Sequence, residues 1–374
     1  MQHVASRSRR RHKKRFHWRS WRIDPWLTLG LLVLVCSGLV VLYSASGESR
    51  YLVEAQTMRF VAAFAVMAVV AQIPPHLLMR MVPLFYLSIV AMLVAVDVIG
   101  SHAMGATRWL EIPGVVRFQP SELMKIVMPM TIAAYLSKRD LPPNWTDLGI
   151  CLFIMGLPVA LIAKQPDLGT SLLVASSAVF VVLLGGLSWR LVGFFAVLAL
   201  AALPLLWLNM HGYQKQRVLT FLNPESDPLG AGWNIIQSKT AIGSGGISGK
   251  GWMEGTQSQL EFLPERHTDF IVAVLGEEFG LIGMLLLLLC YLLIICRGLF
   301  MASRAGDTYG RLLAGSLILT FFVYVFVNIG MVSGLLPVVG VPLPLVSYGG
   351  TASVTLMAGF GILMSVYTHR KSSS

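Results

Sequence analysis

The sequence predicts an all-α polytopic membrane protein with about ten transmembrane helices. Of its 374 residues, 55% are hydrophobic and only 13% are charged, and the mean hydropathy is +0.70. Soluble proteins carry about 25% charged residues, so this composition is typical of a membrane protein. Apolar runs of about 20 residues, the length that crosses a hydrocarbon core, recur along nearly the whole chain. The runs are continuous rather than alternating, which excludes a membrane β-barrel.

The apolar windows set the expected helices and their orientation. They predict helices at about 26–45, 57–73, 82–99, 121–137, 147–164, 170–187, 190–209, 270–296, 309–332 and 346–367. Cytoplasmic loops carry an excess of Lys and Arg. With the N-terminus inside, such residues fall in every second loop and at the C-terminus, so both ends are expected inside: Arg80, Lys138, Arg139, Arg190, Arg297, Arg304, Arg370 and Lys371.

Two tails flank this membrane domain of residues 26–367: a strongly basic one, residues 1–25, and a short one, residues 368–374. The formal net charge is +11, for which nucleic-acid binding is one explanation. The apolar remainder favours attraction of the basic tail to anionic membrane lipids, with no nucleic-acid partner. Because the first apolar run has full spanning length and lacks a small-residue cleavage site, we expect no cleaved signal peptide.

Four loops are predicted on the outer side, at about 46–56, 100–120, 210–268 and 333–345. The third is the longest, and a loop of this length is usually functional or disordered. It contains tryptophans, many glycines and spaced charges rather than low-complexity sequence, so we predict a long ordered extracytoplasmic loop between helices 7 and 8. The cysteines lie in or at the ends of apolar helices without metal-ligand spacing and are expected to pack: Cys36, Cys151, Cys290 and Cys296.

A glycine-rich segment of this loop, AIGSGGISGKGW, comes close to a phosphate-binding motif. It lacks a glycine at Ser244 and a hydroxyl residue at Gly251, and no strand is predicted before it. We interpret its glycines as positions that need positive φ angles or a close approach of two backbones. A phosphate cradled by exposed N–H groups is the alternative.

Seven ionisable residues fall at the outer ends of predicted helices. Charge inside a membrane costs about 2.5–3.5 kcal/mol per residue, so such residues usually line a polar cavity. The alternative is that each is simply interfacial; Glu122 and Lys125, three apart, could form an ordinary ion pair, and Asp167 and Asp269 could cap helices. The seven are Arg108, Glu122, Lys125, Asp167, Arg217, Lys239 and Asp269.

Asp269 is the sharpest candidate among them. An N-cap position in the positive end of a helix dipole favours the carboxylate form, so we expect it to be charged at neutral pH. It could accept a proton from a sugar hydroxyl or hold a divalent cation such as Mg²⁺ or Mn²⁺. Helical geometry allows Glu277 to share its cavity, whereas Glu278 is expected to pack against another helix. His267 and Asp269 form an H-x-D pair without further ligands, so no zinc site is predicted.

Six motifs, in this order, carry a resemblance to a known family. They are VDVIGSHAMGATRWL, VRFQPSELMKI, AKQPDLGTS, NPESDPLGAGWNIIQSKTAIGSGG, GTQSQLEFLPERHTDFI and PVVGVPLPLVSYGG. From about residue 24 to 371 the chain resembles the SEDS proteins (shape, elongation, division and sporulation), which are membrane peptidoglycan glycosyltransferases. The residues of the last two motifs resemble those of the elongation, RodA-like branch rather than those of the division branch.

The resemblance implies lipid II polymerisation at the outer face of the bacterial inner membrane, for cell elongation and rod shape. Asp269 would deprotonate the 4-hydroxyl of the acceptor sugar, which attacks the lipid-linked chain, forms a β-1,4 bond and releases undecaprenyl pyrophosphate. Arg108, Glu122, Lys125 and Asp167 would line the catalytic cavity.

Partners and a possible cofactor also follow from the resemblance. Arg217 and Lys239 would bind the departing pyrophosphate, a task that a divalent cation could share. The family works with a class B penicillin-binding protein, a transpeptidase, among other membrane proteins of the elongation complex. A lipid II flippase or other transporter is the main alternative, because broken helices can frame a transport site, and a scaffold is a third.

Overall fold

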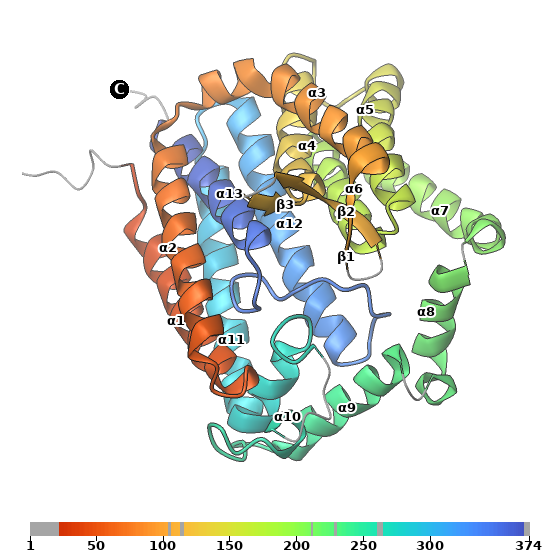
Figure 1. Cartoon of the computed structure of the whole chain (residues 1–374). Helices are drawn as coiled ribbons and strands as arrows, with labels where there is room; N and C mark the ends of the chain where they lie inside the picture. Colours follow the sequence, from red (N-terminus) through yellow and green to blue (C-terminus); the bar gives the residue numbers. More distant parts are fainter. Residues whose placement is uncertain are drawn as a thin grey trace, which may run out of the picture.

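The computed structural model describes residues 22–103, 106–112, 116–210, 212–227, 230–259 and 265–369. The chain forms a bundle of long helices with a small sheet beside it, and an arm of shorter helices below (Figure 1). Most of the predicted basic tail, residues 1–21, and the C-terminal residues 370–374 lie outside the described residues.

The long helices overlap all ten predicted ranges. Seven helices in the described part of the chain are long and apolar enough to cross a membrane, namely α1, α2, α3, α5, α11, α12 and α13, so the chain is a multi-pass membrane protein. α6 and the Trp189–Leu205 part of α7 are shorter apolar helices. The bounds are α1 (Pro25–Ala45), α2 (Arg50–Gln72), α3 (Pro75–Ile99), α4 (Pro120–Leu136), α5 (Trp145–Lys164), α6 (Leu168–Leu184), α7 (Trp189–Asn209), α11 (Ile271–Ser303), α12 (Thr308–Val332) and α13 (Thr351–Thr368).

Several boundaries differ from the prediction because local capping, rather than hydropathy, sets them. α2 begins at Arg50, since the Ser49 side chain accepts a hydrogen bond from the Leu52 N–H and caps the helix. α3 begins at Pro75, a residue suited to a first helical turn. α13 begins only at Thr351, because the preceding segment stays irregular.

The predicted outer loop 100–120 contains a sheet that the sequence analysis missed. Its strands are β1 (Ser101–Ala103), β2 (Ala106–Ile112) and β3 (Val116–Phe118), which pair antiparallel in the order β1-β2-β3. The strands are too short for a clear alternating pattern, which explains the omission. β2 contacts the ends of α3 and α4 and so holds Arg108 beside the bundle.

The long predicted loop 210–268 is largely helical where it is described. It contains α8 (Gly212–Leu222), a 3₁₀ turn (Pro224–Ser226), α9 (Ala231–Ser244) and the single-turn α10 (Thr256–Gln259). α9 packs on α11 and α12, and Ser238 Oγ on α9 donates a 2.8 Å hydrogen bond to the Val332 carbonyl. The prediction of an ordered segment is therefore confirmed for these residues.

α12 lies at the centre of the packing. It contacts α4, α6, α9, α11 and α13. A row of aromatic rings joins three of these helices: Tyr291 on α11 lies 5.9 Å from Phe321 on α12, which lies 5.1 Å from Phe360 on α13. The same helix carries two buried polar residues toward its C-terminal end, Tyr324 and Asn328, and both belong to the site described next.

Candidate active site

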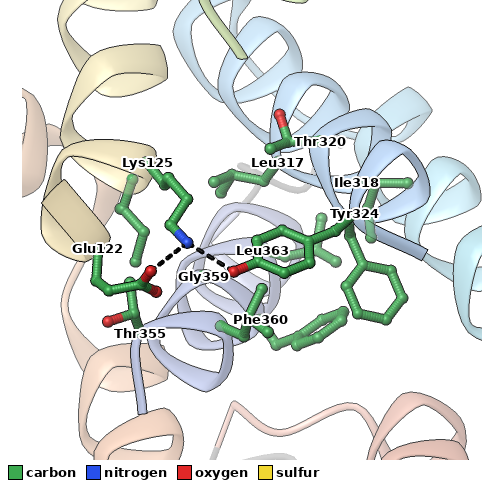
Figure 2. A pocket seen from close by; sticks show the side chains of 13 residues that line it. Glu122, Lys125, Leu317, Ile318, Thr320, Tyr324, Thr355, Gly359, Phe360 and Leu363 are labelled. Carbon is green, nitrogen blue, oxygen red and sulfur yellow. Dashed lines mark hydrogen bonds and ion pairs between the residues drawn. The ribbon is translucent and has the colours of Figure 1, made fainter. Parts of the chain in front are cut away.

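The predicted residues Glu122 and Lys125 form a buried pair in the first turns of α4. Lys125 Nζ lies 2.6 Å from Glu122 Oε1 and 2.7 Å from Tyr324 Oη, and it also sits 4.5 Å from the centre of the Tyr324 ring. Figure 2 shows the ammonium group between the carboxylate and the phenol. The ordinary ion pair considered from the sequence is present, but it is buried and reaches a second helix, α12, so it is more than a surface contact.

A cavity of about 40 Å³ opens beside this pair, between α4, α12 and α13. Its walls are mostly apolar and include Phe321, and Figure 2 shows Phe360 and Leu363 across from the charged pair. Glu122 Oε2 is buried and has no hydrogen-bond partner among the described residues. Buried polar atoms are nearly always satisfied, so this oxygen marks a place where a water or a ligand hydroxyl would bind.

Arg108 and Asp167 form a second pair, between β2 and α6. Asp167 is the N-cap of α6, as the capping alternative predicts, and its Oδ1 accepts from the Thr170 N–H at 3.2 Å. Arg108 Nη1 lies 3.9 Å from the same carboxylate, and its guanidinium also donates to the carbonyls of Gln165 and Pro166. Capping and ion pairing therefore coexist in one residue.

These two pairs are neighbours. Gln119, just before α4, donates a 2.7 Å hydrogen bond from Nε2 to Asp167 Oδ2. The structure therefore brings four of the seven predicted residues into one polar group at the N-terminal ends of α4 and α6: Arg108, Glu122, Lys125 and Asp167.

Asp269 lies in a tight turn before α11, not at its N-cap. The N-cap is Phe270, without a side-chain hydrogen bond, so the predicted capping role of Asp269 is wrong. The turn is closed by the N–H groups of Thr268 and Phe270, which donate to the Glu265 carbonyl at 3.0 and 3.3 Å. Glu265 itself has a φ of 54°, which forces the chain to reverse before the helix begins.

The PVVGVPLPLVSYGG segment, residues 337–350, folds around this turn. Asn328 on α12, fully buried, joins the two by donating from Nδ2 to the carbonyls of Asp269 (3.0 Å) and Val341 (2.7 Å). The Tyr348 N–H donates to the His267 carbonyl at 2.9 Å, and a Cβ on Gly340 would lie 3.5 Å from Asp269 Oδ2. The carboxylate is thus held against backbone, in a half-buried position.

Electrostatics around Asp269 differ from the sequence-based expectation. Burial, and then the nearby Glu265 carboxylate, raise the pKa of Asp269 to about 6, while the Arg217 guanidinium acts in the opposite direction. We expected the helix dipole to favour the charged form, but desolvation outweighs it because Asp269 lies outside the first turn. At neutral pH the group is still mostly a carboxylate, and a more basic one than an ordinary aspartate.

Three apolar or aromatic side chains pack between the elements that hold Asp269 and those that hold the polar group of Arg108, Glu122, Lys125 and Asp167. Leu173 on α6, Tyr324 on α12 and Val341 of the 337–350 segment pack together. A Cβ on Gly169, two residues after Asp167, would lie 3.0 Å from the Val339 carbonyl. The segment beside Asp269 is therefore the same one that contacts the start of α6.

Arg217 and Lys239 differ in their relation to this region. Arg217, on α8, is close enough for its charge to lower the pKa of Asp269. Lys239, on α9, is exposed, and its aliphatic stem lies against Gly334 at the end of α12. The structure thus links Arg217 to Asp269 and gives Lys239 a separate position.

The two glutamates of α11 are both buried and have different partners. Glu278 accepts a hydrogen bond from Ser44 on α1, which confirms that it packs against another helix. Helical geometry allowed Glu277 to share a cavity with Asp269. Instead, Glu277 Oε1 pairs with Lys250 Nζ at 2.7 Å. Among the described residues, no three His, Cys, Asp or Glu side chains group closely enough to hold a metal ion; Glu265 is close enough to Asp269 to raise the pKa of that carboxyl.

Sequence reasoning missed three residues of this region: Gln119, Tyr324 and Asn328. Tyr324 and Asn328 lie four apart on one face of an apolar helix, and a polar residue inside a membrane helix is itself a signal of function. That signal was available in VYVFVNIG and was not used. Gln119 had no such signal, because its contact with Asp167 depends on the fold.

The sequence comparisons agree with this picture. A family model described as cell cycle protein, FtsW/RodA/SpoVE, matches residues 21–372. Peptidoglycan glycosyltransferase MrdB of Escherichia coli K12 is 56% identical over 361 residues, which cover 96% of this chain and 97% of that protein. A probable peptidoglycan glycosyltransferase FtsW of Geobacter metallireducens is 36% identical and covers 94% of this chain and 96% of its own length.

Solved structures give the same result. A chain from a study of the structural coordination of polymerization and crosslinking by a peptidoglycan synthase complex superposes with a TM-score of 0.82 at 30% identity, covering 94% of this chain and 99% of that one. The rod shape determining protein RodA of Thermus thermophilus superposes with a TM-score of 0.71 at 28% identity, covering 94% and 98%. The chain therefore belongs to the SEDS family of FtsW, RodA and SpoVE proteins, as a RodA-like member.

Proposed function

We infer that this chain is a peptidoglycan glycosyltransferase that polymerises lipid II into β-1,4-linked glycan strands, for cell elongation and maintenance of rod shape. The observation that carries this inference is Asp269, a half-buried carboxylate whose pKa is raised to about 6, held in a fixed turn beside a group of buried charges. The 56% identical relative named a peptidoglycan glycosyltransferase supports the polymerase over the lipid II flippase.

In the proposed reaction, Asp269 accepts the proton of the acceptor 4-hydroxyl while that oxygen attacks the anomeric carbon of the lipid-linked chain. The bond from this carbon to the pyrophosphate oxygen breaks, and undecaprenyl pyrophosphate leaves with the electron pair. One attack inverts an α-linked donor to a β-linked product. A general base is most effective when its pKa lies close to the working pH, which favours the raised pKa of Asp269 over that of an ordinary aspartate.

The cationic residues are proposed to receive the substrate. Arg108 and Lys125, each already paired with a carboxylate, would line the cavity with Glu122 and Asp167 and orient the sugars. Arg217, and less directly Lys239, would face the pyrophosphate, where positive charge stabilises the departing dianion. If Mg²⁺ or Mn²⁺ takes part, the neighbouring carboxylates of Asp269 and Glu265 would hold it, and the ion would neutralise charge on the leaving group.

The arrangement in the membrane is part of the proposal. Ten spans within residues 26–367 would leave the tails 1–25 and 368–374 in the cytoplasm and the loop 210–268 in the periplasm of a bacterial inner membrane. The basic tail would bind anionic lipids. A class B penicillin-binding protein would supply crosslinking, together with other proteins of the elongation complex; the likeness to a chain of a peptidoglycan synthase complex supports such a partner.

The decisive experiment is polymerisation of lipid II by the purified chain with its transpeptidase partner. We expect Asp269→Asn to lose about 10²–10⁴-fold of the rate, the usual contribution of a general base. Asp97→Asn, which changes a carboxylate paired with the exposed Lys164, is the matched control and should retain activity. Full activity of Asp269→Asn would remove its role as base.

Two further arms separate the alternatives. A divalent-metal chelator added to the wild-type reaction shows whether a cation is needed. Liposomes that contain the wild-type chain and lipid II test transport: lipid II that crosses the membrane without polymer formation would support a flippase and contradict the glycosyltransferase.

A further inference from the structure

α11 is broken at its tenth residue, Gly280, and the glycine-rich loop fills the break. Gly280 has φ 62° and ψ −158°, a conformation that glycine alone adopts readily. The Leu281 and Ile282 N–H groups therefore turn away from their own helix and donate to the carbonyls of Gly246 and Ile247 at 3.0 and 3.1 Å. In return, the Lys250 and Gly251 N–H groups donate to the carbonyls of Glu277 and Glu278, both at 3.1 Å.

The glycines of AIGSGGISGKGW make this docking possible. A Cβ on Gly249 would lie 2.1 Å from the Glu278 carbonyl oxygen, and Gly246, Gly249 and Gly251 all have positive φ angles. The structure therefore bears out the interpretation of these glycines as positions of positive φ and close backbone approach. The Gly251 amide binds α11, whereas the Gly249 amide donates to the Gly245 carbonyl within the loop.

One side-chain pair fastens the loop to the helix. Glu277, fully buried, accepts at Oε1 from Lys250 Nζ (2.7 Å), Thr256 Oγ1 (3.2 Å) and the Gln257 N–H (2.9 Å). Lys250 Nζ also donates to Thr256 Oγ1 at 2.8 Å. A buried carboxylate without its cation is strongly destabilising, so loss of Lys250 would release the loop.

The part of α11 that the loop fastens directly follows the turn that contains Asp269. The half-helix Ile271–Phe279 runs between the Asp269 turn and the break, and it is about 13 Å long by helical rise. Asn328 holds its beginning through the Asp269 carbonyl, and the docked loop holds its end through Glu277 and Glu278. With both ends held, the half-helix has one position relative to α12.

We propose that Lys250 is a positioning residue for Asp269: through Glu277 it clamps the loop of residues 245–257 onto the break in α11 and so fixes the half-helix that presents the base. The clamp acts at a distance of about two helical turns from the chemistry. It rests on the proposed glycosyltransferase function, because Asp269 must be the base for its position to matter. A misplacement of about 1 Å in a catalytic group can cost about 100-fold in rate, so a clamp of this kind bears directly on turnover.

The test compares Lys250→Met with the double variant K250M/E277Q and with Lys164→Met, a matched control that breaks the exposed pair with Asp97. We expect Lys250→Met to lower kcat for lipid II polymerisation by about 10-fold or more with little change in KM, because substrate contacts are untouched. The double variant removes the unpaired charge and should recover much of the loss, whereas Lys164→Met should match the wild type.

A second measurement does not depend on activity. Amide hydrogen exchange in the same detergent-purified proteins should speed up by about 10-fold or more in residues 246–251 and 277–282 of Lys250→Met, since their mutual hydrogen bonds open. Wild-type turnover in Lys250→Met, lost turnover without faster exchange, or no recovery in the double variant would each overturn the clamp. If the wild type makes no polymer, the proposed function fails, and the exchange data still decide whether the clamp exists.

Discussion

Asp269 is a carboxylate on which two opposite charges act. Burial and Glu265 raise its pKa to about 6, and Arg217 opposes them. The protonated form cannot accept a proton from the acceptor hydroxyl, so the rate of polymerisation should rise with pH through about 6 and level off above it. A pH–rate profile of kcat/KM, which reports groups of the free enzyme, measures this midpoint.

The charges of Glu265 and Arg217 predict in which direction the midpoint of this pH–rate profile moves when either is removed. Glu265→Gln removes a negative charge, so protonation of Asp269 becomes less favourable and the midpoint should move to lower pH; Arg217→Gln should move it to higher pH. Glu225→Gln, exposed on the 3₁₀ turn, should leave it unchanged. A midpoint that is the same in all three variants would mean that another group titrates.

At the scale of elements, the break in α11 is the feature most sensitive to a single methyl group. A Cβ at position 280 would lie 2.3 Å from the Gly249 nitrogen, and the backbone there has a positive φ. Gly280→Ala should therefore destabilise the protein by at least the about 1–3 kcal/mol typical of such strain. Thermal aggregation of the detergent-purified protein, followed by size-exclusion chromatography, should show a lower midpoint temperature and a loss of turnover.

Gly156→Ala is the control for this substitution. Gly156 lies within α5, and a Cβ there would meet no atom within 4 Å. Alanine favours a helix over glycine by about 0.5–1 kcal/mol, so the midpoint should stay or rise slightly. A Gly280→Ala protein as stable as Gly156→Ala would mean that α11 runs through position 280 unbroken.

Elements differ in how far the sequence determines them. All ten long helices were predictable, because an apolar run of about 20 residues has few other outcomes in a membrane protein. The sheet at Ser101–Phe118 was not, since its strands are short and depend on pairing across a loop. The break at Gly280 was also hidden: the surrounding sequence stays apolar, and the partner that makes the break favourable lies some thirty residues earlier, in the loop about Gly249.

The site shows the same division. Glu122, Lys125 and Asp167 were predictable because charges at the outer ends of apolar helices are costly and therefore informative. Their partners were not, because Gln119 reaches Asp167 and Tyr324 reaches Lys125 across separate helices. The pKa of Asp269 was misjudged for a similar reason: the dipole follows from local sequence, whereas burial under residues 337–350 is a property of the fold.

At the scale of the whole molecule, the orientation of the loops depends on whether α4, α6 and α7 cross the membrane, since the seven apolar spans of the described residues do not include them. α6 has 17 residues, about 25 Å by helical rise, which is shorter than a hydrocarbon core of about 30 Å. If all three cross, the short loop between α4 and α5 and the loop between α6 and α7 lie inside, and the α9–α10 region lies outside. Each helix that fails to cross reverses every loop after it.

Single cysteines at exposed positions decide this. In a chain whose four native cysteines are replaced by serine, we expect a membrane-impermeant maleimide to label Glu254→Cys on intact cells, and to label Asp140→Cys and Arg190→Cys only after permeabilisation. Labelling of Asp140→Cys on intact cells would show that α4 does not cross, and labelling of Arg190→Cys with Asp140→Cys protected would show that α6 does not. Protection of Glu254→Cys, with Arg190→Cys also protected, would show that α7 does not, and Asp269 would then face the cytoplasm, where it could not act on an outer-face substrate.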